Sequence, residues 1–190
     1  MNKKRKIIGI LTILMMLSLP ITVVAITNTN TNHSELIYTR ETGFIYEAGL
    51  QLKKDREIVE NLLFIDIPIG IAVWSSNNYI LNCTFINCQD EGILLMGCNN
   101  KIMNCVFYNC GDGIELQKSS DNIFQNCRFL SNVHAGTDGI IDNNNNNLFV
   151  SCVFYDNPFG IYFSDSEANS YNNCVFLNNK IDMKGEIWKK

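Results

Sequence analysis

The sequence predicts an all-β fold, a right-handed parallel β-helix of about six to seven rungs, each of roughly 22 residues. Three observations predict it: a repeated glycine–isoleucine pair, a cysteine that recurs at a nearly constant step, and apolar residues that alternate over short runs. The pairs are Gly70-Ile71, Gly92-Ile93, Gly113-Ile114, Gly139-Ile140 and Gly160-Ile161. The cysteines that follow them are Cys83, Cys105, Cys127, Cys152 and Cys174, separated by steps of 22, 22, 25 and 22 residues.

Each rung is expected to contain three short strands separated by polar turns. After the glycine, apolar residues alternate, as Ile71 and Val73 do, and this is the period of a strand. An asparagine precedes each cysteine by five residues and a phenylalanine follows it by two, as Asn78, Cys83 and Phe85 illustrate. The segments between these runs are rich in asparagine, glycine and serine, which is typical of turns.

A single rung of this kind cannot bury its inner face, so the rungs must stack. Parallel stacking at about 4.8 Å places the cysteines and phenylalanines in inward-facing columns. A degenerate earlier rung begins at Gly49, and residues 181–183 begin a seventh. The leucine-rich repeat has an overlapping period, but it requires a leucine-dominated consensus, whereas this chain uses isoleucine, phenylalanine and cysteine. The pattern therefore favours the β-helix.

The repeated asparagines and cysteines are expected to be structural. Stacked asparagine amides form hydrogen-bonded ladders, and asparagine tolerates the left-handed backbone that tight turns need. Cysteines in an inward column act as small buried apolar residues, and no metal site is expected. Cys88 and Cys110 share a second column, so they are the better-placed pair if a disulfide forms.

The run from Gly113 to Phe129, GIELQKSSDNIFQNCRF, resembles the repeat unit of the pectate-lyase-like superfamily. More narrowly, it is similar to the NosD-like and generic right-handed β-helix repeat proteins. The resemblance extends over residues 47–183 and implies the fold. It implies no single activity, because that superfamily contains lyases, hydrolases, epimerases, adhesins and structural proteins.

The domain organisation follows from the two ends of the chain. Residues 1–25 are predicted to be a signal peptide: a basic start, an apolar run of about 13 residues, Pro20, and small residues at the end. An uncleaved membrane anchor is the alternative, although a span needs roughly 20 apolar residues. We then expect an N-terminal arm or cap over 26–46, the β-helix over 47–183 and a C-terminal tail over 184–190. The expected location is secreted, extracellular or on the cell surface.

Charge limits the partners. The predicted signal peptide holds four of the 15 basic residues, which leaves 11 basic against 19 acidic residues in the remainder. A nucleic-acid partner needs a clustered basic face, so none is expected. The membrane is a partner only if the N-terminal segment stays uncleaved.

Residues on either side of each repeated phenylalanine are expected to face outward and to form an apolar stripe. The stripe comprises Thr84, Val106, Arg128, Val153 and Val175 in one column, and Ile65, Ile86, Tyr108, Leu130, Tyr155 and Leu177 in the other. A long exposed apolar patch usually marks a covered or partnered surface. Residues 36–46 could fold over it; otherwise Tyr108, Arg128 and Tyr155 are candidates for binding a glycan or a protein.

Acidic residues near the long cysteine step form the other candidate site. The extra residues are expected within 133–137, and Glu91, Asp112 and Asp138 are expected to stack in one column with Glu115 and His134 nearby. Stacked carboxylates suit Ca²⁺ binding or acid–base catalysis on a polysaccharide.

No complete lyase or hydrolase constellation is recognisable, so the sequence favours a non-catalytic role. The expectation is an exported module that binds glycans or proteins or serves as structure, without a cofactor. The alternative is a lyase or glycosidase-like enzyme using Asp112, Glu115, His134 and Asp138.

Overall fold

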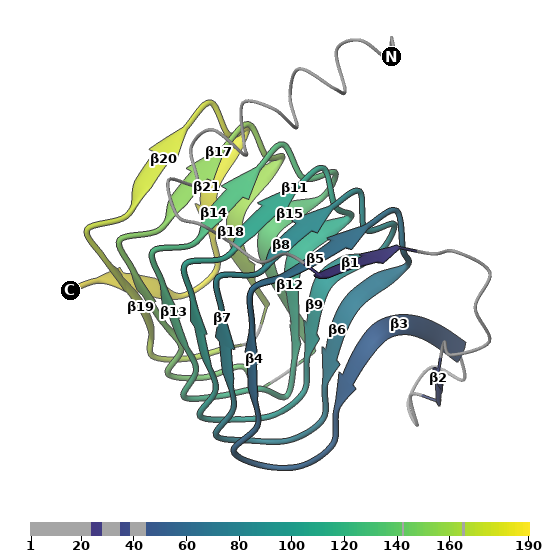
Figure 1. The fold of residues 1–190 in the computed structure, drawn as a ribbon. Coiled ribbons are helices and arrows are strands. Elements are labelled where there is room, and N and C mark those ends of the chain that lie inside the picture. Colours follow the sequence, from purple (N-terminus) through teal and green to yellow (C-terminus); the bar gives the residue numbers. More distant parts are fainter. Residues whose placement is uncertain (1–23, 28–34, 39–44, 142, 165) are drawn as a thin grey trace, which may run out of the picture.

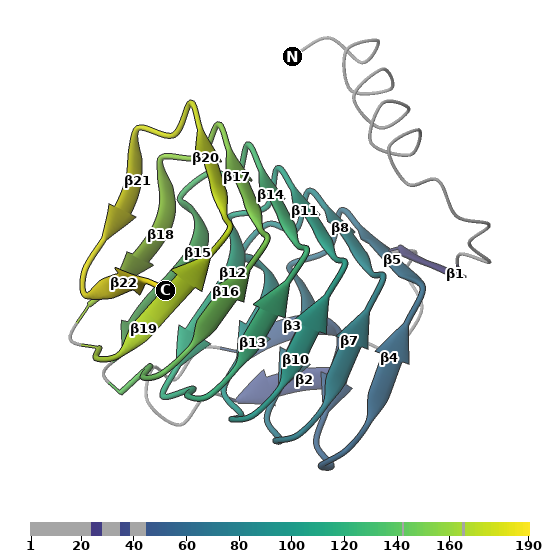
Figure 2. The same cartoon turned by 90° about the vertical axis from the view of Figure 1, so that its left-hand side faces the viewer.

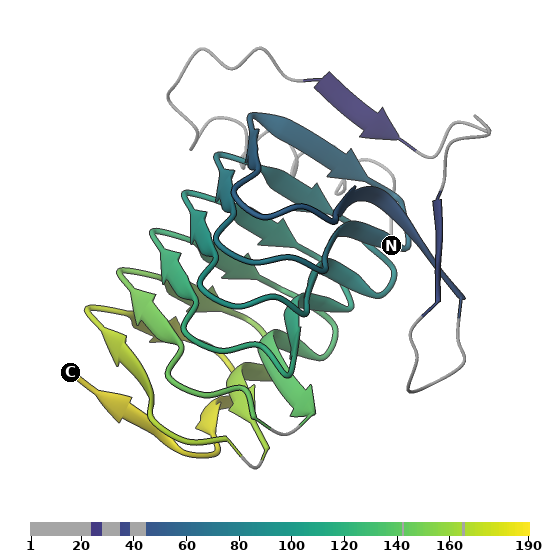
Figure 3. The same cartoon turned by 90° about the horizontal axis from the view of Figure 1, so that it is seen from below.

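The computed structural model describes residues 24–27, 35–38, 45–141, 143–164 and 166–190. These residues wind into an all-β parallel solenoid in which each turn adds one strand to each of three sheets (Figures 1 and 3). The predicted β-helix and its repeat of about 22 residues are therefore confirmed. The predicted signal peptide lies outside the described residues except for its last two positions.

The three sheets hold seven, eight and seven strands, and we call them A, B and C. Sheet A contains β1 (Val24–Thr27), β5 (Leu62–Ile65), β8 (Thr84–Ile86), β11 (Val106–Tyr108), β14 (Arg128–Leu130), β17 (Val153–Tyr155) and β20 (Val175–Leu177). Sheet B contains β2 (Glu35–Tyr38), β3 (Ile45–Leu52), β6 (Ile69–Val73), β9 (Glu91–Leu95), β12 (Asp112–Gln117), β15 (Ala135–Ile141), β18 (Phe159–Phe163) and β21 (Ile181–Lys184). Sheet C contains β4 (Ile58–Glu60), β7 (Tyr79–Leu81), β10 (Lys101–Met103), β13 (Ile123–Gln125), β16 (Leu148–Val150), β19 (Asn169–Asn172) and β22 (Ile187–Lys189).

Within one sheet, strands of successive rungs lie side by side, so the row of strands follows the solenoid axis, as the row from β4 to β19 in Figure 2 shows. Among the described strands every pairing is parallel except that of β2 with β3, which is antiparallel. β1 pairs with β5 and so extends the first edge of sheet A. The described part of 36–46 thus extends sheet B by pairing in its plane and does not lie across sheet A; residues 39–44 lie outside the described part.

The core is built from stacked identical residues. Six phenylalanines, one per rung in sheet A, lie with ring centroids 4.7 to 5.0 Å apart and nearly parallel planes. They are Phe64, Phe85, Phe107, Phe129, Phe154 and Phe176. The cysteine column beside them is buried as expected over its first four members, and all eight cysteines are free thiols. Each inward aromatic or aliphatic residue contributes roughly 1.5–3 kcal/mol on burial.

All three corners of the helix use residues with a left-handed backbone. One rung places them five residues apart at Asn99, Asn104 and Asn109, with φ values of 56°, 56° and 53°. The same three positions recur in the other rungs, mostly as asparagine, aspartate or serine. Asparagine adopts this conformation with little strain because its short amide bonds locally, so these residues set the bends.

A second set of asparagines forms a buried ladder, which confirms their structural role. Asn100 Oδ1 accepts a hydrogen bond from the backbone N–H of Asn78 at 2.8 Å, and Asn122 Oδ1 accepts one from Asn100 at 2.8 Å. Asn147 and Asn169 continue the ladder in the next two rungs. The donors are mainly backbone groups of the preceding rung, so the ladder satisfies buried N–H groups that the turn leaves without a strand partner.

The glycine column corrects one predicted alignment. The member in β15 is Gly136, and not Gly139 as the glycine–isoleucine pairs predicted. A Cβ on Gly113 would lie 2.4 Å from the carbonyl oxygen of Gly136, and one on Gly136 would lie 2.7 Å from that of Gly160, so only glycine fits this stack. β15 bulges relative to β12 near its end. Part of the extra residues of this rung therefore lies after Gly139, and they are not confined to 133–137.

Candidate functional site

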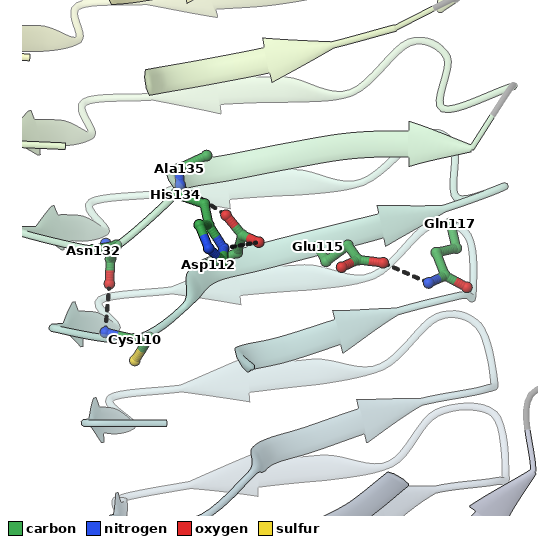
Figure 4. A network of polar contacts seen from close by, with 7 residues as sticks. All are labelled: Cys110, Asp112, Glu115, Gln117, Asn132, His134 and Ala135. Atoms are coloured by element: carbon green, nitrogen blue, oxygen red, sulfur yellow. Dashed lines mark hydrogen bonds and ion pairs between the residues drawn. The ribbon is translucent and has the colours of Figure 1, made fainter. Parts of the chain in front are cut away.

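Four carboxyl groups gather on the outer face of sheet B near its centre, and Figure 4 shows two of them, Asp112 and Glu115. Glu91 of β9 lies opposite Asp112 of β12, and Glu115 of β12 lies opposite Asp138 of β15. Because strands in a sheet are about 4.8 Å apart, these side chains are close neighbours. We call Glu91, Asp112, Glu115 and Asp138 the carboxylate cluster.

The four candidates from the sequence, Asp112, Glu115, His134 and Asp138, come together here. His134 Nδ1 lies 3.6 Å from Asp112 Oδ2. The expectation of one column for Glu91, Asp112 and Asp138 is wrong for Asp138, which faces Glu115 in the next column. Ala135 takes the place beside Asp112, because the glycine that follows is Gly136.

Hydrogen bonding in the cluster is incomplete. Asp112 Oδ1 accepts from the backbone N–H of Ala135 at 2.7 Å, and Gln117 Nε2 donates to Glu115 Oε1 (Figure 4). Glu91 Oε2 and Asp138 Oδ1 are buried and have no hydrogen-bond partner. Buried polar atoms are nearly always paired, so two orphan carboxyl oxygens in one cluster mark an unusual site.

Burial and mutual repulsion keep protons on the cluster. Burial, followed by the charge of Glu115, raises the pKa of Glu91 to about 10. Burial raises the pKa of Asp138 to about 7, with further contributions from Asp112 and Glu115. The pKa of Asp112 rises to about 6 by burial, although nearby His134 opposes the rise. At neutral pH the cluster therefore contains both proton donors and acceptors, the combination that general acid–base chemistry uses.

An aromatic pair adjoins the cluster on the next strand, β18. Tyr162 of β18 lies opposite Asp138 and Phe159 lies opposite Ala135. The rings of Phe159 and Tyr162 are stacked at 5.4 Å between centroids. Lys184 Nζ, from β21, lies 4.6 Å from the centre of the Tyr162 ring and 5.6 Å from that of Phe159. The outer face of sheet B thus changes from acidic to aromatic within one strand.

Sequence reasoning missed this aromatic pair. Tyr162 comes two residues after Gly160, just as Glu115 comes two residues after Gly113 and Asp138 two after Gly136. The outward column could have been found from that offset. It was hidden because the alignment on Gly139 placed Asp138 before the glycine.

On the other side of the cluster the outer face of sheet B is apolar. Ala48, Ile69, Ala72 and Leu94 are buried together, and Trp74 and Met96 pack against them. The indole Nε1 of Trp74 is buried without a partner. The carboxylate cluster therefore lies between an apolar zone and an aromatic one on a single face.

The family model described as a right handed beta helix region matches residues 48–187. This chain belongs to the right-handed β-helix family. Comparison with curated proteins gave no match. The family explains the repeat, the glycine column and the three sheets of this β-helix protein, but the carboxylate cluster has to be interpreted from its own geometry.

The apolar stripe predicted on sheet A exists, but only its later part is exposed. Tyr108, Leu130 and Tyr155 share one outward column, and Arg128 lies between Val106 and Val153 in the other. The earlier members Thr84, Ile86 and Val106 are buried. Tyr155 and Leu177 are 41% and 51% exposed. Of the three binding candidates of this β-helix protein, Tyr155 is exposed, whereas Tyr108 and Arg128 are half-buried.

Two kinds of arrangement are absent from the described residues of this β-helix protein. No group of three or more histidine, cysteine, aspartate or glutamate side chains within them has the arrangement to hold a metal ion. No helix in the same part of the chain is long and apolar enough to cross a membrane.

Proposed function

We propose that this β-helix protein is an exported glycan-binding module whose binding surface is the outer face of sheet B. The observation that supports it is the aromatic pair Phe159–Tyr162 lying next to the carboxylate cluster on one sheet face. Aromatic rings offer an apolar face to the C–H groups of a sugar ring, while carboxylates and amides accept hydrogen bonds from its hydroxyls.

The reachable part of this surface has the right polarity. Asp138 and Gln117 are half-buried, and the side chain of His134 is 69% exposed. Asp138 Oδ1 is buried and lacks a partner, so the half-buried carboxyl has hydrogen-bonding capacity that the protein itself does not use. A rigid sheet keeps these groups at fixed spacing, which lowers the entropic cost of binding. Export is supported by the basic start and short apolar run of residues 1–25.

The test is a glycan array followed by calorimetry on the hits. We expect Tyr162→Ala and Asp138→Asn each to weaken binding at least tenfold, because a lost aromatic contact or charged hydrogen bond is worth about 1.5 kcal/mol or more. Tyr79→Ala is the matched control, since Tyr79 is likewise a surface tyrosine beneath a lysine, on sheet C, and is more exposed than the half-buried Tyr162. Failure of every glycan to bind, or loss of binding in Tyr155→Ala with none in Tyr162→Ala, would contradict the proposal.

A second candidate, glycosidic-bond hydrolysis, is favoured by the raised pKa values of Asp112 and Asp138. In such a reaction a protonated carboxyl gives its proton to the glycosidic oxygen while a carboxylate takes a proton from the attacking water, so that one water is added across the broken C–O bond. The measurement is new reducing ends after prolonged incubation with bound glycans, with and without Ca²⁺. Asp138→Ala should abolish them; turnover that survives this substitution rejects the site.

A further inference from the structure

We infer that the last turn of the solenoid, residues 169–190, docks end-on to the surface of an anionic lipid bilayer. This inference goes beyond the proposed glycan site and does not depend on it, and it concerns a different part of the chain from residues 1–25. Three features of the last turn support it: exposed apolar side chains, an excess of lysine and unpaired strand edges.

Exposed apolar side chains gather on the last turn. Of the eight large hydrophobic side chains that are exposed in the described part of the chain, four belong to this turn. Trp188 is 63% exposed on β22, Val175 and Leu177 are exposed on β20, and Ile181 is exposed on β21. They come from all three sheets and so surround this end of the solenoid. Exposed tryptophan beside aliphatic residues is typical of surfaces that bind the headgroup region of a membrane.

The last turn is cationic, although the chain as a whole is acidic. Its charged residues are the exposed lysines Lys180, Lys184, Lys189 and Lys190 and the acids Asp182 and Glu186. Four lysines against two acids give this turn a net charge of +2. Residues 45–168 contain six basic and 15 acidic residues, a net charge of −9. An anionic surface therefore attracts this end and repels the rest of the solenoid, which orients the molecule end-on.

The end of the solenoid is a shallow layer with free strand edges (Figure 2). β20, β21 and β22 are the last strands of sheets A, B and C, and no described strand pairs with their outer edges. One layer of strands is about 4.8 Å deep, and amphipathic surfaces enter a bilayer to about 5–10 Å. Unpaired backbone groups need water or headgroup partners, so the contact stays above the hydrocarbon. The outward side chains of this one turn are therefore the ones that enter.

A second copy of the chain fits this end less well than a bilayer does. A further turn on sheet B would extend the glycine column past Asp182, which follows Gly160 in that column. A Cβ on Gly160 would lie 2.4 Å from the Asp182 carbonyl oxygen, so the Cβ that Asp182 has would meet the next carbonyl just as closely. Two such ends facing each other would both be positively charged and would repel. A bilayer surface imposes neither restriction.

The experiment measures quenching of Trp188 fluorescence by vesicles with brominated acyl chains. The chain has two tryptophans, so the quenching that Trp188→Phe removes from the full-length protein reports Trp188 alone. We expect quenching and a blue shift with equal parts of phosphatidylglycerol and phosphatidylcholine, and at least tenfold weaker binding to pure phosphatidylcholine. Protein that binds the anionic vesicles without quenching of Trp188, as it would if residues 1–25 alone held it there, would overturn the inference.

Matched substitutions at the two ends of the solenoid test the orientation in the same titration. Lys189→Gln combined with Lys190→Gln should weaken binding to the anionic vesicles about 25-fold, because each lysine near an anionic surface contributes about fivefold. Lys53→Gln combined with Lys54→Gln changes an exposed lysine pair in the first turn and should alter binding by less than about twofold. Equal losses from the two pairs would contradict end-on docking.

The apolar contribution has its own matched pair. Leu177→Ser should weaken binding severalfold by removing apolar surface that the bilayer covers, whereas Ile58→Ser should not, because Ile58 is 67% exposed on β4 at the opposite end. A soluble polygalacturonate that binds the parent as tightly as the anionic vesicles would overturn the assignment to a bilayer. So would self-association in lipid-free sedimentation that the Lys189 and Lys190 substitutions abolish.

Discussion

Raising the pH should weaken the fold at the carboxylate cluster, and Asp138 provides the sharpest test. In the unfolded chain its pKa is near 3.8, and in the folded protein burial raises it to about 7. The folded state holds this proton more tightly than the unfolded state does. The stabilisation is therefore fully present below about pH 3.8 and is lost as the pH rises through about 7.

The magnitude follows from these two pKa values. Between pH 5 and pH 8, ionisation of Asp138 removes about 2.6 kcal/mol from the free energy of unfolding. Screening by water reduces this to about 2 kcal/mol, because part of the carboxyl reaches solvent. Asparagine has nearly the same shape and does not ionise, so Asp138→Asn should be about 2 kcal/mol more stable relative to the parent at pH 8 than at pH 5.

The assay is urea unfolding followed by circular dichroism at both pH values. Asp66→Asn serves as the control, because this exposed carboxyl accepts a hydrogen bond from Asn87 outside the cluster, and its effect should be the same at both pH values. An Asp138→Asn effect that is also equal at the two values would refute the argument. It would mean that the Asp138 carboxyl is solvated like an ordinary surface acid.

The remaining predictions concern the fold and its thiols. Asn122→Ala removes the acceptor of the Asn100 N–H and the donor to Ser119 Oγ, and should cost about 3 kcal/mol in urea unfolding. The same change at the half-buried Gln125 should cost under about 0.5 kcal/mol. Phe107→Ala interrupts the phenylalanine stack and should cost about 3–5 kcal/mol; a loss below about 1 kcal/mol would show that the stack is not tightly packed. Among the thiols, half-buried Cys98 should react first with a disulfide reagent in the native protein. The hydrogen bond with the neighbouring Cys152 thiol, followed by burial, raises the pKa of Cys174, so equal or faster labelling there would contradict this order.

Much of the fold could be predicted because the apolar residues that recur in every rung are the ones that are buried. Phe85, Phe107 and Phe129 recur at the same offset from the cysteine, and a residue type that recurs every rung lies in one column. The columns also revealed the asparagine ladder. What the repeat could not show is which donor bonds each asparagine, since the backbone N–H groups become available only when the turn has its final shape.

The candidate site could be predicted in its members but not in its register. Asp112, Glu115, His134 and Asp138 were identifiable because they lie near the irregular step of the repeat. Their pairing was not, because the 25-residue cysteine step shows that residues are inserted but not at which points of the rung they shift the register. The same shift hid Tyr162, which faces Asp138 only when Gly136 is the glycine of that rung.

A solenoid can keep buried acids where a globular core would not. Each rung contacts only its neighbours, so the cost of placing Glu91, Asp112 and Glu115 together falls on two adjacent strands of one sheet. In those same rungs the phenylalanine stack and the asparagine ladder run uninterrupted on the inner side of the wall. The inner face supplies stability while the outer face carries groups that weaken the fold at high pH. Such groups are typical of binding and catalytic sites, and this is the physical reason to look for function on the outer face of sheet B.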